Sequence, residues 1–175
     1  MQTNTNTNLP TYVFTTVNSG RVAKVVEELK QNSQIDFIAP VTGRYDLVLR
    51  LKQSNPTQVY QAIQQIRAVA DVRTTDAHTA FDGIQPNRQP ESQMAFGISL
   101  LNCVQHQSIE STIKQLSNVP GLVEAYSVPG QFDIVALWQA KNTEEIMKTS
   151  VEKVPNLQGI FSSETLLASK PFFRF

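Results

Sequence analysis

Two stretches of the sequence share one pattern, APVTGRYDLVLRL at residues 39–51 and YSVPGQFDIVALW at residues 126–138. Each contains a loop of the form Val-x-Gly-x-aromatic-Asp that leads directly into an apolar run. Gly43 and Gly130 are 87 positions apart, and the apolar positions of an upstream helix recur at the same offset. A fixed period of this kind indicates an internal repeat. The sequence therefore predicts two copies of one domain.

The spacing changes once along the repeat. Val59 corresponds to Met147 and Val72 corresponds to Ile160, both at an offset of 88 rather than 87. This predicts one added residue near the start of the last helix of the second copy. Two copies fill the chain of 175 residues, so each is near the small end of the usual domain range.

The composition indicates a globular protein and excludes several classes. Hydrophobic residues make up 41% and charged residues 17%, while Lys plus Arg and Asp plus Glu both number 15. The sequence has no basic patch or arm of the kind that would indicate direct binding of nucleic acid. The single cysteine, Cys103, excludes an internal disulfide framework or a cysteine-rich metal site. The opening residues lack the pattern of a secretory signal, and no segment has the ~18 apolar residues of a membrane span. We therefore expect a cytoplasmic protein without a membrane partner.

The same order of elements is predicted in both halves. Strands rich in β-branched and aromatic residues alternate with helices whose apolar positions follow i, i+3, i+4 and i+7. In the first half, the third strand alternates Tyr45, Leu47, Leu49 and Leu51 with Asp46, Val48, Arg50 and Lys52, which predicts one buried face. Its counterpart at residues 132–138 is apolar on both faces, which predicts cover by the other half or by another chain.

Capping residues mark the expected helix starts. Asn55 followed by Pro56 is a helix start, since proline at the first helical position has no N–H to leave unpaired. Ser19, Ser108 and Asn142 precede the other helical patterns. Between the halves, GIQPNRQPESQ at residues 83–93 contains two prolines and no periodicity and is predicted to be a semi-stiff linker.

Strand, helix, strand, strand, helix, strand is the βαββαβ order of ferredoxin-like domains. We therefore predict an α+β fold of two tandem ferredoxin-like domains, of the dimeric α+β barrel type, with antiparallel sheets and helices on one face of each. The expected boundaries are a disordered tail at 1–10, a first domain at 11–82, a linker at 83–93, a second domain at 94–169 and an apolar tail at 170–175. The free sheet faces should pack on each other.

The combination of VTGRYDLVL, a capped helix and a strand with the paired hydroxyls of VRTTDA resembles the effector-binding (RAM) domain of the Lrp/AsnC family of amino-acid-responsive regulators. The second half matches with VPGQFDIVA and IFSSET. The resemblance covers nearly the whole chain from Tyr12 to about Leu167. It implies two effector domains without the helix-turn-helix domain of the gene regulators. It also implies sensing of a small-molecule effector, an amino acid or a related metabolite, and assembly into homo-oligomers or with a full-length Lrp/AsnC-type regulator.

The glycine loop has the chemistry of an amino-acid site. Glycine lets the backbone N–H groups approach a carboxylate, and an aspartate at the start of the next strand can bind an ammonium group. The resemblance places ligands near this loop with hydroxyls from the last strand. The ligand-binding candidates are Gly43, Tyr45, Asp46, Thr74 and Thr75 in the first half, and Gly130, Phe132, Asp133, Ser162 and Ser163 in the second. Phe132 lacks the tyrosine hydroxyl, so we expect the second site to bind more weakly.

Three alternatives remain open from the sequence. The loop aspartates could be turn residues that only bind nearby backbone. The chain could be a purely structural assembly subunit, or a haem-binding or oxygen-using enzyme of the α+β barrel type with His78 or His106 as a ligand. No phosphate-binding loop, nucleophile elbow or metal-spaced cluster is present. We therefore expect no enzymatic activity, no catalytic residue, no metal and no cofactor.

Overall fold

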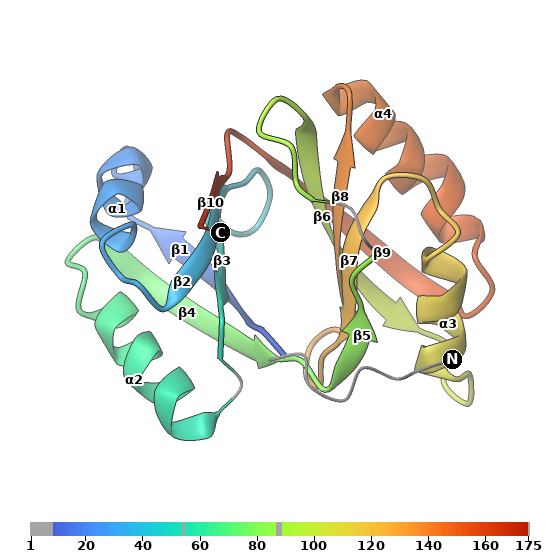
Figure 1. The fold of residues 1–175 in the computed structure, drawn as a ribbon, viewed down its shortest axis with the longest axis horizontal. Helices are drawn as coiled ribbons and strands as arrows, with labels where there is room; N and C mark the ends of the chain where they lie inside the picture. Colours follow the sequence, from blue (N-terminus) through green and yellow to red (C-terminus); the bar gives the residue numbers. More distant parts are fainter. Residues whose placement is uncertain (1–8, 54, 87–88, 175) are drawn as a thin grey trace.

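A computed structural model describes residues 9–53, 55–86 and 89–174, and the chain forms two halves with the same order of elements (Figure 1). The first half consists of β1 (Thr11–Val17), α1 (Val22–Leu29), β2 (Ile35–Pro40), β3 (Leu47–Leu51), α2 (Pro56–Arg67) and β4 (Val72–Thr79). The second consists of β6 (Ala95–Cys103), α3 (Ile109–Leu116), β7 (Leu122–Ser127), β8 (Ile134–Ala140), α4 (Thr143–Lys148) and β9 (Ile160–Ala168). Two short strands, β5 (Asp82–Ile84) and β10 (Phe172–Phe173), follow the last strand of each half.

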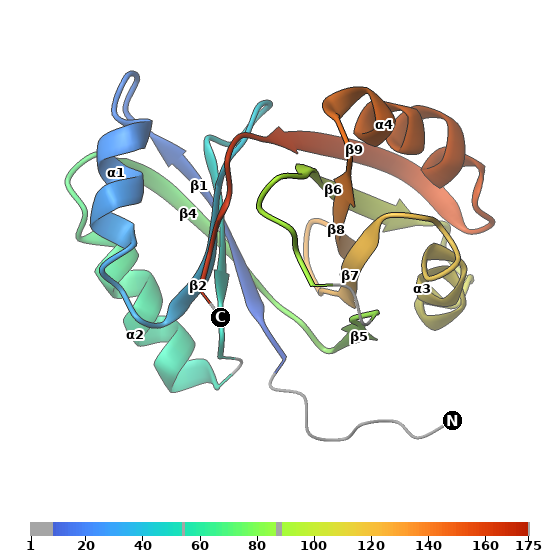
Figure 2. The same cartoon turned by 45° about the horizontal axis from the view of Figure 1, so that its top comes forward.

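The strands form two antiparallel five-stranded sheets, in the orders β10-β2-β3-β1-β4 and β5-β7-β8-β6-β9. The helices cover the outer faces, and the inner faces lie opposite each other (Figures 1 and 2). This confirms the predicted α+β fold of the dimeric barrel type.

Each sheet takes its fifth strand from the other half. β5 follows the first half but pairs with β7, and β10 follows the second half but pairs with β2. We call β5 and β10 the exchanged arms. Part of the predicted linker is therefore a strand, because Gly83 and Ile84 pair with Tyr126 and Ala125. The predicted disordered tail falls mostly outside the described residues.

The buried side chains form one core between the sheets and one under the helices of each half. The core between the sheets, which we call the intersheet core, contains residues of both halves, among them Phe14, Phe37, Phe96, Phe132 and Leu137. Hydrophobic burial at about 25 cal/mol per Å² is the main favourable term in such packing. The two halves therefore complete each other, as the sequence predicts.

The inner strands are covered on both faces. Val135 and Leu137 of β8 lie in the intersheet core, while Ile134 and Trp138 lie against the helices. The expectation of a single buried face for β3 is wrong, because Val48 also lies in the intersheet core, opposite the buried leucines of the same strand.

Three of the four predicted helix caps are present. The side chains of Asn55, Ser108 and Asn142 accept hydrogen bonds from backbone N–H groups in the first turns of α2, α3 and α4. The prediction for Ser19 is wrong, because α1 begins after Arg21 without a side-chain cap. Among the described residues, no helix is long and apolar enough to cross a membrane.

The added residue of the second half coincides with an irregular helix end. After α4 the chain continues as a π-helical turn at Thr149–Lys153 and a 3₁₀ turn at Val154–Asn156. A π turn accommodates one more residue than an α turn in the same axial length. The insertion is thus absorbed at the end of the helix rather than near its start, where the sequence predicts it.

Candidate functional site

Each glycine loop packs against the last strand of the other half. Gly43 and Gly130 have φ angles of 112° and 127°, which favour glycine. A Cβ atom at Gly43 would lie 2.9 Å from a methyl carbon of Leu166, and one at Gly130 would lie 3.3 Å from the imidazole of His78. The glycines are thus required by the turn and by the close approach of the two halves.

The two loop aspartates bind the backbone of the first strand of their own half. Asp46 Oδ2 accepts a hydrogen bond of 2.8 Å from Val17 N, and Asp133 Oδ2 accepts one of 2.7 Å from Cys103 N. Both N–H groups lie at irregularities in the strand pairing, where the regular ladder is interrupted. Each carboxylate therefore has a structural role, and its second oxygen has no hydrogen-bond partner among the described residues.

The side-chain hydroxyls of β4 and β9 lie beside the same irregularities in strand pairing. Thr74 Oγ1 is 2.5 Å from Thr16 Oγ1, and Ser162 Oγ accepts a 3.2 Å bond from Asn102. Thr75 pairs with Thr15 in the ladder, and Ser163 is exposed. The structure thus places Asp46 and Thr74 beside the end of β1. It places Asp133 and Ser162 beside the equivalent end of β6.

Tyr45 and Phe132 face away from these strand ends, towards the intersheet core. The Tyr45 ring lies 5.1 Å from that of Phe14, and its hydroxyl is 3.3 Å from Asp76 Oδ2. Burial, followed by the charge of Asp76, raises the pKa of Tyr45. Phe132 is 2% exposed and packs on Phe14 and His78. The predicted aspartates and aromatic residues of the two loops therefore do not share one site, because the aspartates lie at the strand ends and the aromatic rings lie at the intersheet core.

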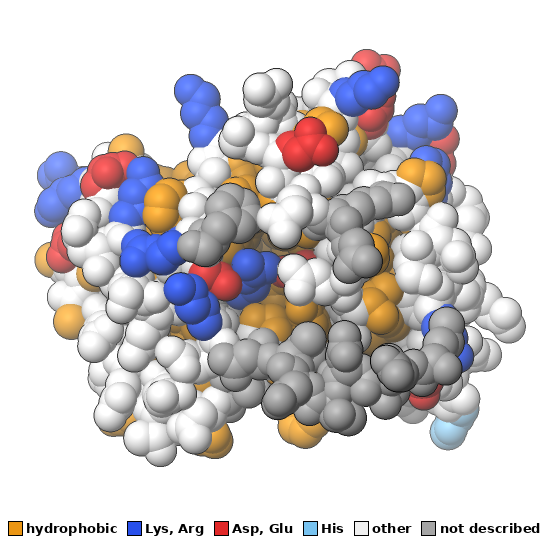
Figure 3. Space-filling view, viewed as in Figure 1, with side chains coloured by type: hydrophobic (Ala, Val, Ile, Leu, Met, Phe, Trp, Pro, Cys, Tyr) orange, Lys and Arg blue, Asp and Glu red, His pale blue; other side chains and the backbone are white. Residues whose placement is uncertain are grey.

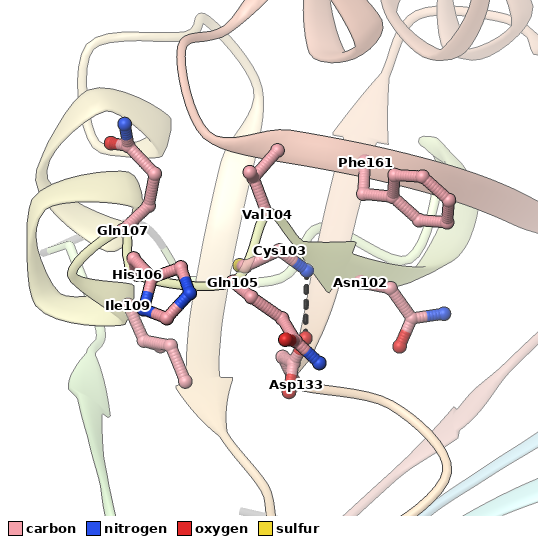
Figure 4. Close-up of a pocket in the computed structure, with 9 residues that line it drawn as sticks. All are labelled: Asn102, Cys103, Val104, Gln105, His106, Gln107, Ile109, Asp133 and Phe161. Carbon is pink, nitrogen blue, oxygen red and sulfur yellow. Dashed lines mark hydrogen bonds between the residues drawn. The ribbon is translucent and has the colours of Figure 1, made fainter.

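A pocket of about 610 Å³ opens beside Asp133 at the end of β6 (Figure 4). Figure 4 shows Phe161 of β9 on one side and His106 and Gln107, before α3, on the other. The lining residues are Asn102, Cys103, Val104, Gln105, His106, Gln107, Ile109, Asp133 and Phe161. Only Asp133 among the predicted site residues lines it. The amides and His106 were not predicted as ligand-binding residues because the loop after β6 carries no motif, and Phe161 was passed over although it lies in the quoted IFSSET stretch.

The pocket combines a carboxylate with polar groups and an apolar wall. His106 has a φ angle of 70°, an unusual conformation for a residue other than glycine, and precedes Ser108, the cap of α3. The positive end of α3 therefore lies at the pocket. Burial, and then the charge of Asp133, raises the pKa of the Cys103 thiol, which disfavours a thiolate nucleophile here.

The corresponding region of the first half contains an ion pair. Lys24 Nζ lies 2.9 Å from Asp71 Oδ2, and Asn18 donates to the other oxygen at 3.3 Å. These hydrogen bonds, that of Lys24 first, lower the pKa of Asp71. Gly159 stands at the position of Asp71 in the second half. The two halves thus differ at the strand ends where both sites are expected.

His78 does not have the surroundings of a haem ligand. The imidazole is 4% exposed and lies between the rings of Phe14 and Phe132, at 5.6 and 5.3 Å. Its Nε2 atom is 3.0 Å from Asp76 Oδ2 without the alignment of a hydrogen bond. Both ring nitrogens are buried, and a Cβ atom at Gly130 would lie 3.3 Å from the imidazole. His106 lies instead at the pocket beside Asp133.

The chain shares its fold with solved structures that include enzymes. The siroheme decarboxylase NirDL is 11% identical, with a TM-score of 0.68 over 94% of this chain and 72% of that chain. An anthrone oxidase-like protein is 8% identical, with a TM-score of 0.58 over 97% of this chain and 94% of that one. At these identities the likeness shows the fold alone. It nevertheless corrects our expectation that the chain is not an enzyme, because this fold carries a decarboxylase and the missing catalytic motifs do not exclude one.

Sequence comparison identifies the first half more specifically. An uncharacterized HTH-type transcriptional regulator of Pyrococcus furiosus is 31% identical over 55 residues, which cover 31% of this chain and 37% of that protein. The chain thus matches well under half of this relative. The profile of the Lrp/AsnC ligand binding domain matches residues 11–90. Residues 11–90 therefore belong to the Lrp/AsnC ligand-binding domain family.

Proposed function

We propose that the chain is a small-molecule sensor whose second half is a further Lrp/AsnC-like effector domain and binds an amino acid or a related metabolite. The observation that carries this proposal is the pocket of about 610 Å³ beside Asp133. Its volume is within the ~300–1,000 Å³ typical of ligand pockets. The matching element order of the halves and the repeated glycine loop support a second effector domain.

The pocket offers complementary groups to an amino acid. Asp133 can accept hydrogen bonds from an ammonium group with the oxygen that does not bind Cys103 N. The positive end of α3 and the side chains of His106 and Gln105 favour a carboxylate. Val104 and Phe161 supply an apolar wall for a side chain. This reverses the ranking expected from the sequence, in which the second site is the weaker.

In this proposal, ligand binding is transmitted through association of the chain with another protein subunit. Phe161 is 77% exposed and Val104 is 42% exposed at the rim of the pocket. Such apolar side chains beside a ligand site are suited to cover by another subunit. The partner is a second copy of the chain or a full-length Lrp/AsnC-type regulator in the cytoplasm, and DNA is contacted by that regulator rather than by this chain.

The test is a thermal-shift screen of the intact chain with the proteinogenic amino acids, followed by calorimetric titration of each one that stabilises the protein. A ligand at a hundredfold excess over its dissociation constant adds about 2.7 kcal/mol to the free energy of unfolding. Asp133→Asn keeps an acceptor for Cys103 N but removes the charge. We expect it to weaken binding by about 1.5–3 kcal/mol.

Asp46→Asn is the matched control, because Asp46 accepts the equivalent hydrogen bond from Val17 N. It should leave ligand affinity unchanged. If both variants bind the ligand as tightly as the wild type, the site has been placed wrongly. If no amino acid or related metabolite stabilises the protein, the proposed ligand class is wrong.

A further inference from the structure

A buried network of charged residues joins the two halves at one end of the intersheet core. Arg50 Nη1 lies 2.6 Å from both carboxylate oxygens of Glu124, and its Nε donates to Asp36 at 2.8 Å. The hydroxyl of Tyr12 also donates to Glu124. Tyr12 is fully buried and Glu124 is 1% exposed. In the view of Figure 3, basic and acidic side chains lie close together near the middle of the molecule, between the halves.

The internal repeat supplies a comparison for this network. The strand registers place Ile98 and Leu137 where the first half has Tyr12 and Arg50, because both pairs lie opposite each other in equivalent strands. Phe37 of the first half occupies the position that Glu124 has in the second. All three counterparts are fully buried in the intersheet core. The charges are thus present at only one of two equivalent ends.

The exchanged arms β10 and β5 also differ between the apolar end and the polar end of the intersheet core. At the apolar end, Phe173 of β10 packs its ring 5.0 Å from that of Phe37 and 5.2 Å from that of Phe96. At the polar end, the position equivalent to Phe173 is Gln85, the residue after β5. A pocket of about 320 Å³ opens here, and its lining residues are Pro10, Asp36, Arg50, Lys52, Gln85, Glu124 and Tyr126. One end is filled by a phenylalanine and the other is an open pocket.

Hydrogen-bond donors outnumber acceptors in this pocket. Arg50 uses Nε and Nη1 for the carboxylates, and its Nη2 has no hydrogen-bond partner among the described residues. In that described part of the chain, the hydroxyl of Tyr126, which is 7% exposed, and the solvent-exposed side chains of Lys52 and Gln85 also lack one. The acceptors without a partner among the described residues are the second oxygen of Asp36, the amide oxygen of Gln85 and the hydroxyl oxygen of Tyr126. One nitrogen of the mostly buried guanidinium of Arg50 is therefore available at a cavity that the exposed Lys52 also lines.

We propose that this pocket binds a small monocarboxylate through Arg50 Nη2, Lys52 and the Tyr126 hydroxyl. Guanidinium and ammonium groups form charge-assisted hydrogen bonds with a carboxylate. Asp36 and Glu124 offset both positive charges, which disfavours a doubly charged phosphate. The pocket is about half the volume of the one beside Asp133, which suits a ligand of few atoms. It is a second site, independent of the proposed amino-acid pocket.

The test is an NMR titration of the ¹⁵N-labelled intact chain with acetate and with benzoate, against sodium chloride and inorganic phosphate at matched ionic strength. We expect saturable shifts of the amide signals of Lys52, Gln85 and Tyr126 with at least one of the carboxylates. Shifts that do not saturate, or that chloride or phosphate reproduces, would overturn the proposal.

Two variants leave the Arg50–Glu124 pair intact. Lys52→Gln and Tyr126→Phe should each raise the dissociation constant of the carboxylate probe roughly threefold to tenfold, as expected for one polar contact. Lys141→Gln and Tyr60→Phe make the same changes at exposed positions elsewhere and should leave it unchanged. Unchanged affinity in both pocket variants would contradict the site. Asp133→Asn should not affect the probe, so failure here is separate from failure of the amino-acid pocket.

Discussion

The fold alters the titration of the buried phenol of Tyr12. Burial, and then the charge of Glu124, raises the pKa of Tyr12 well above its usual value, although Arg50 acts in the opposite direction. The folded state therefore holds this proton at pH values where the unfolded state, with a pKa of about 10, has lost it. The associated stability is fully present below about pH 10 and is lost as the pH rises further.

Tyr12→Phe should therefore reduce the decline of unfolding free energy above about pH 10. One residue contributes at most about 1.4 kcal/mol per pH unit to that slope. Urea unfolding between neutral and strongly alkaline pH measures it. Tyr60→Phe is the matched control, because that ring is 63% exposed and meets solvent in both states. Identical slopes for wild type and Tyr12→Phe would contradict the proposed linkage.

Single residues differed in how far the sequence could place them. The caps at Asn55, Ser108 and Asn142 follow from local chemistry, since their partners lie within three positions. Arg50 was assigned to the exposed face of an alternating strand, but Glu124, its partner, is 74 positions away. No local pattern signals such a pair. The loop aspartates were found from their motif, whereas their bonds to Val17 and Cys103 depend on strand pairing.

Among the elements, the exchanged arm β10 makes the contact that is easiest to isolate. Phe173 is half-buried and packs on Phe37 of the first half and Phe96 of the second. We expect Phe173→Ala to lower the free energy of unfolding by about 1–3 kcal/mol, less than the ~3–5 kcal/mol of a fully buried phenylalanine. Chemical denaturation measures this loss.

Phe161→Ala provides the control for the arm. Phe161 is 77% exposed, so its removal should change stability by no more than about 0.5 kcal/mol. Equal effects of the two substitutions would show that β10 does not hold the halves together.

Long periodic elements were predictable and short ones were not. The helices and main strands follow from apolar spacing, but β5 and β10 contain only three and two residues. Such strands show no periodicity and exist because the opposite sheet offers an unpaired edge. The π turn at Thr149–Lys153 was visible only as a change of offset, and its place in the helix was not.

At the scale of the whole molecule, the intersheet core and the exchanged arms should keep the halves together without a covalent connection. If a protease site is introduced between β5 and β6 and cleaved, we expect the two fragments to elute as one species of the original size in size-exclusion chromatography. Cleavage removes the high effective concentration of a linked pair, so stability should become dependent on protein concentration. Separate elution of the fragments under native conditions would contradict this expectation.

The common order of elements in the two halves and the packing of the sheets could be predicted, because they follow from a repeated pattern and from a strand that is apolar on both faces. The difference between the two ends of the intersheet core could not. It depends on which residues from distant strands meet there, such as Arg50 with Glu124 at one end and Phe37 with Phe173 at the other.

The exchanged arms also govern the order in which the protein can be completed during synthesis. Translation proceeds from the amino terminus, so β1 to β4 leave the ribosome long before β10, which pairs with β2. Until then the edge of β2 is open, and an open edge is a template for pairing with another nascent chain. On a polysome, where several copies emerge close together, β10 of one copy can reach β2 of its neighbour as well as its own.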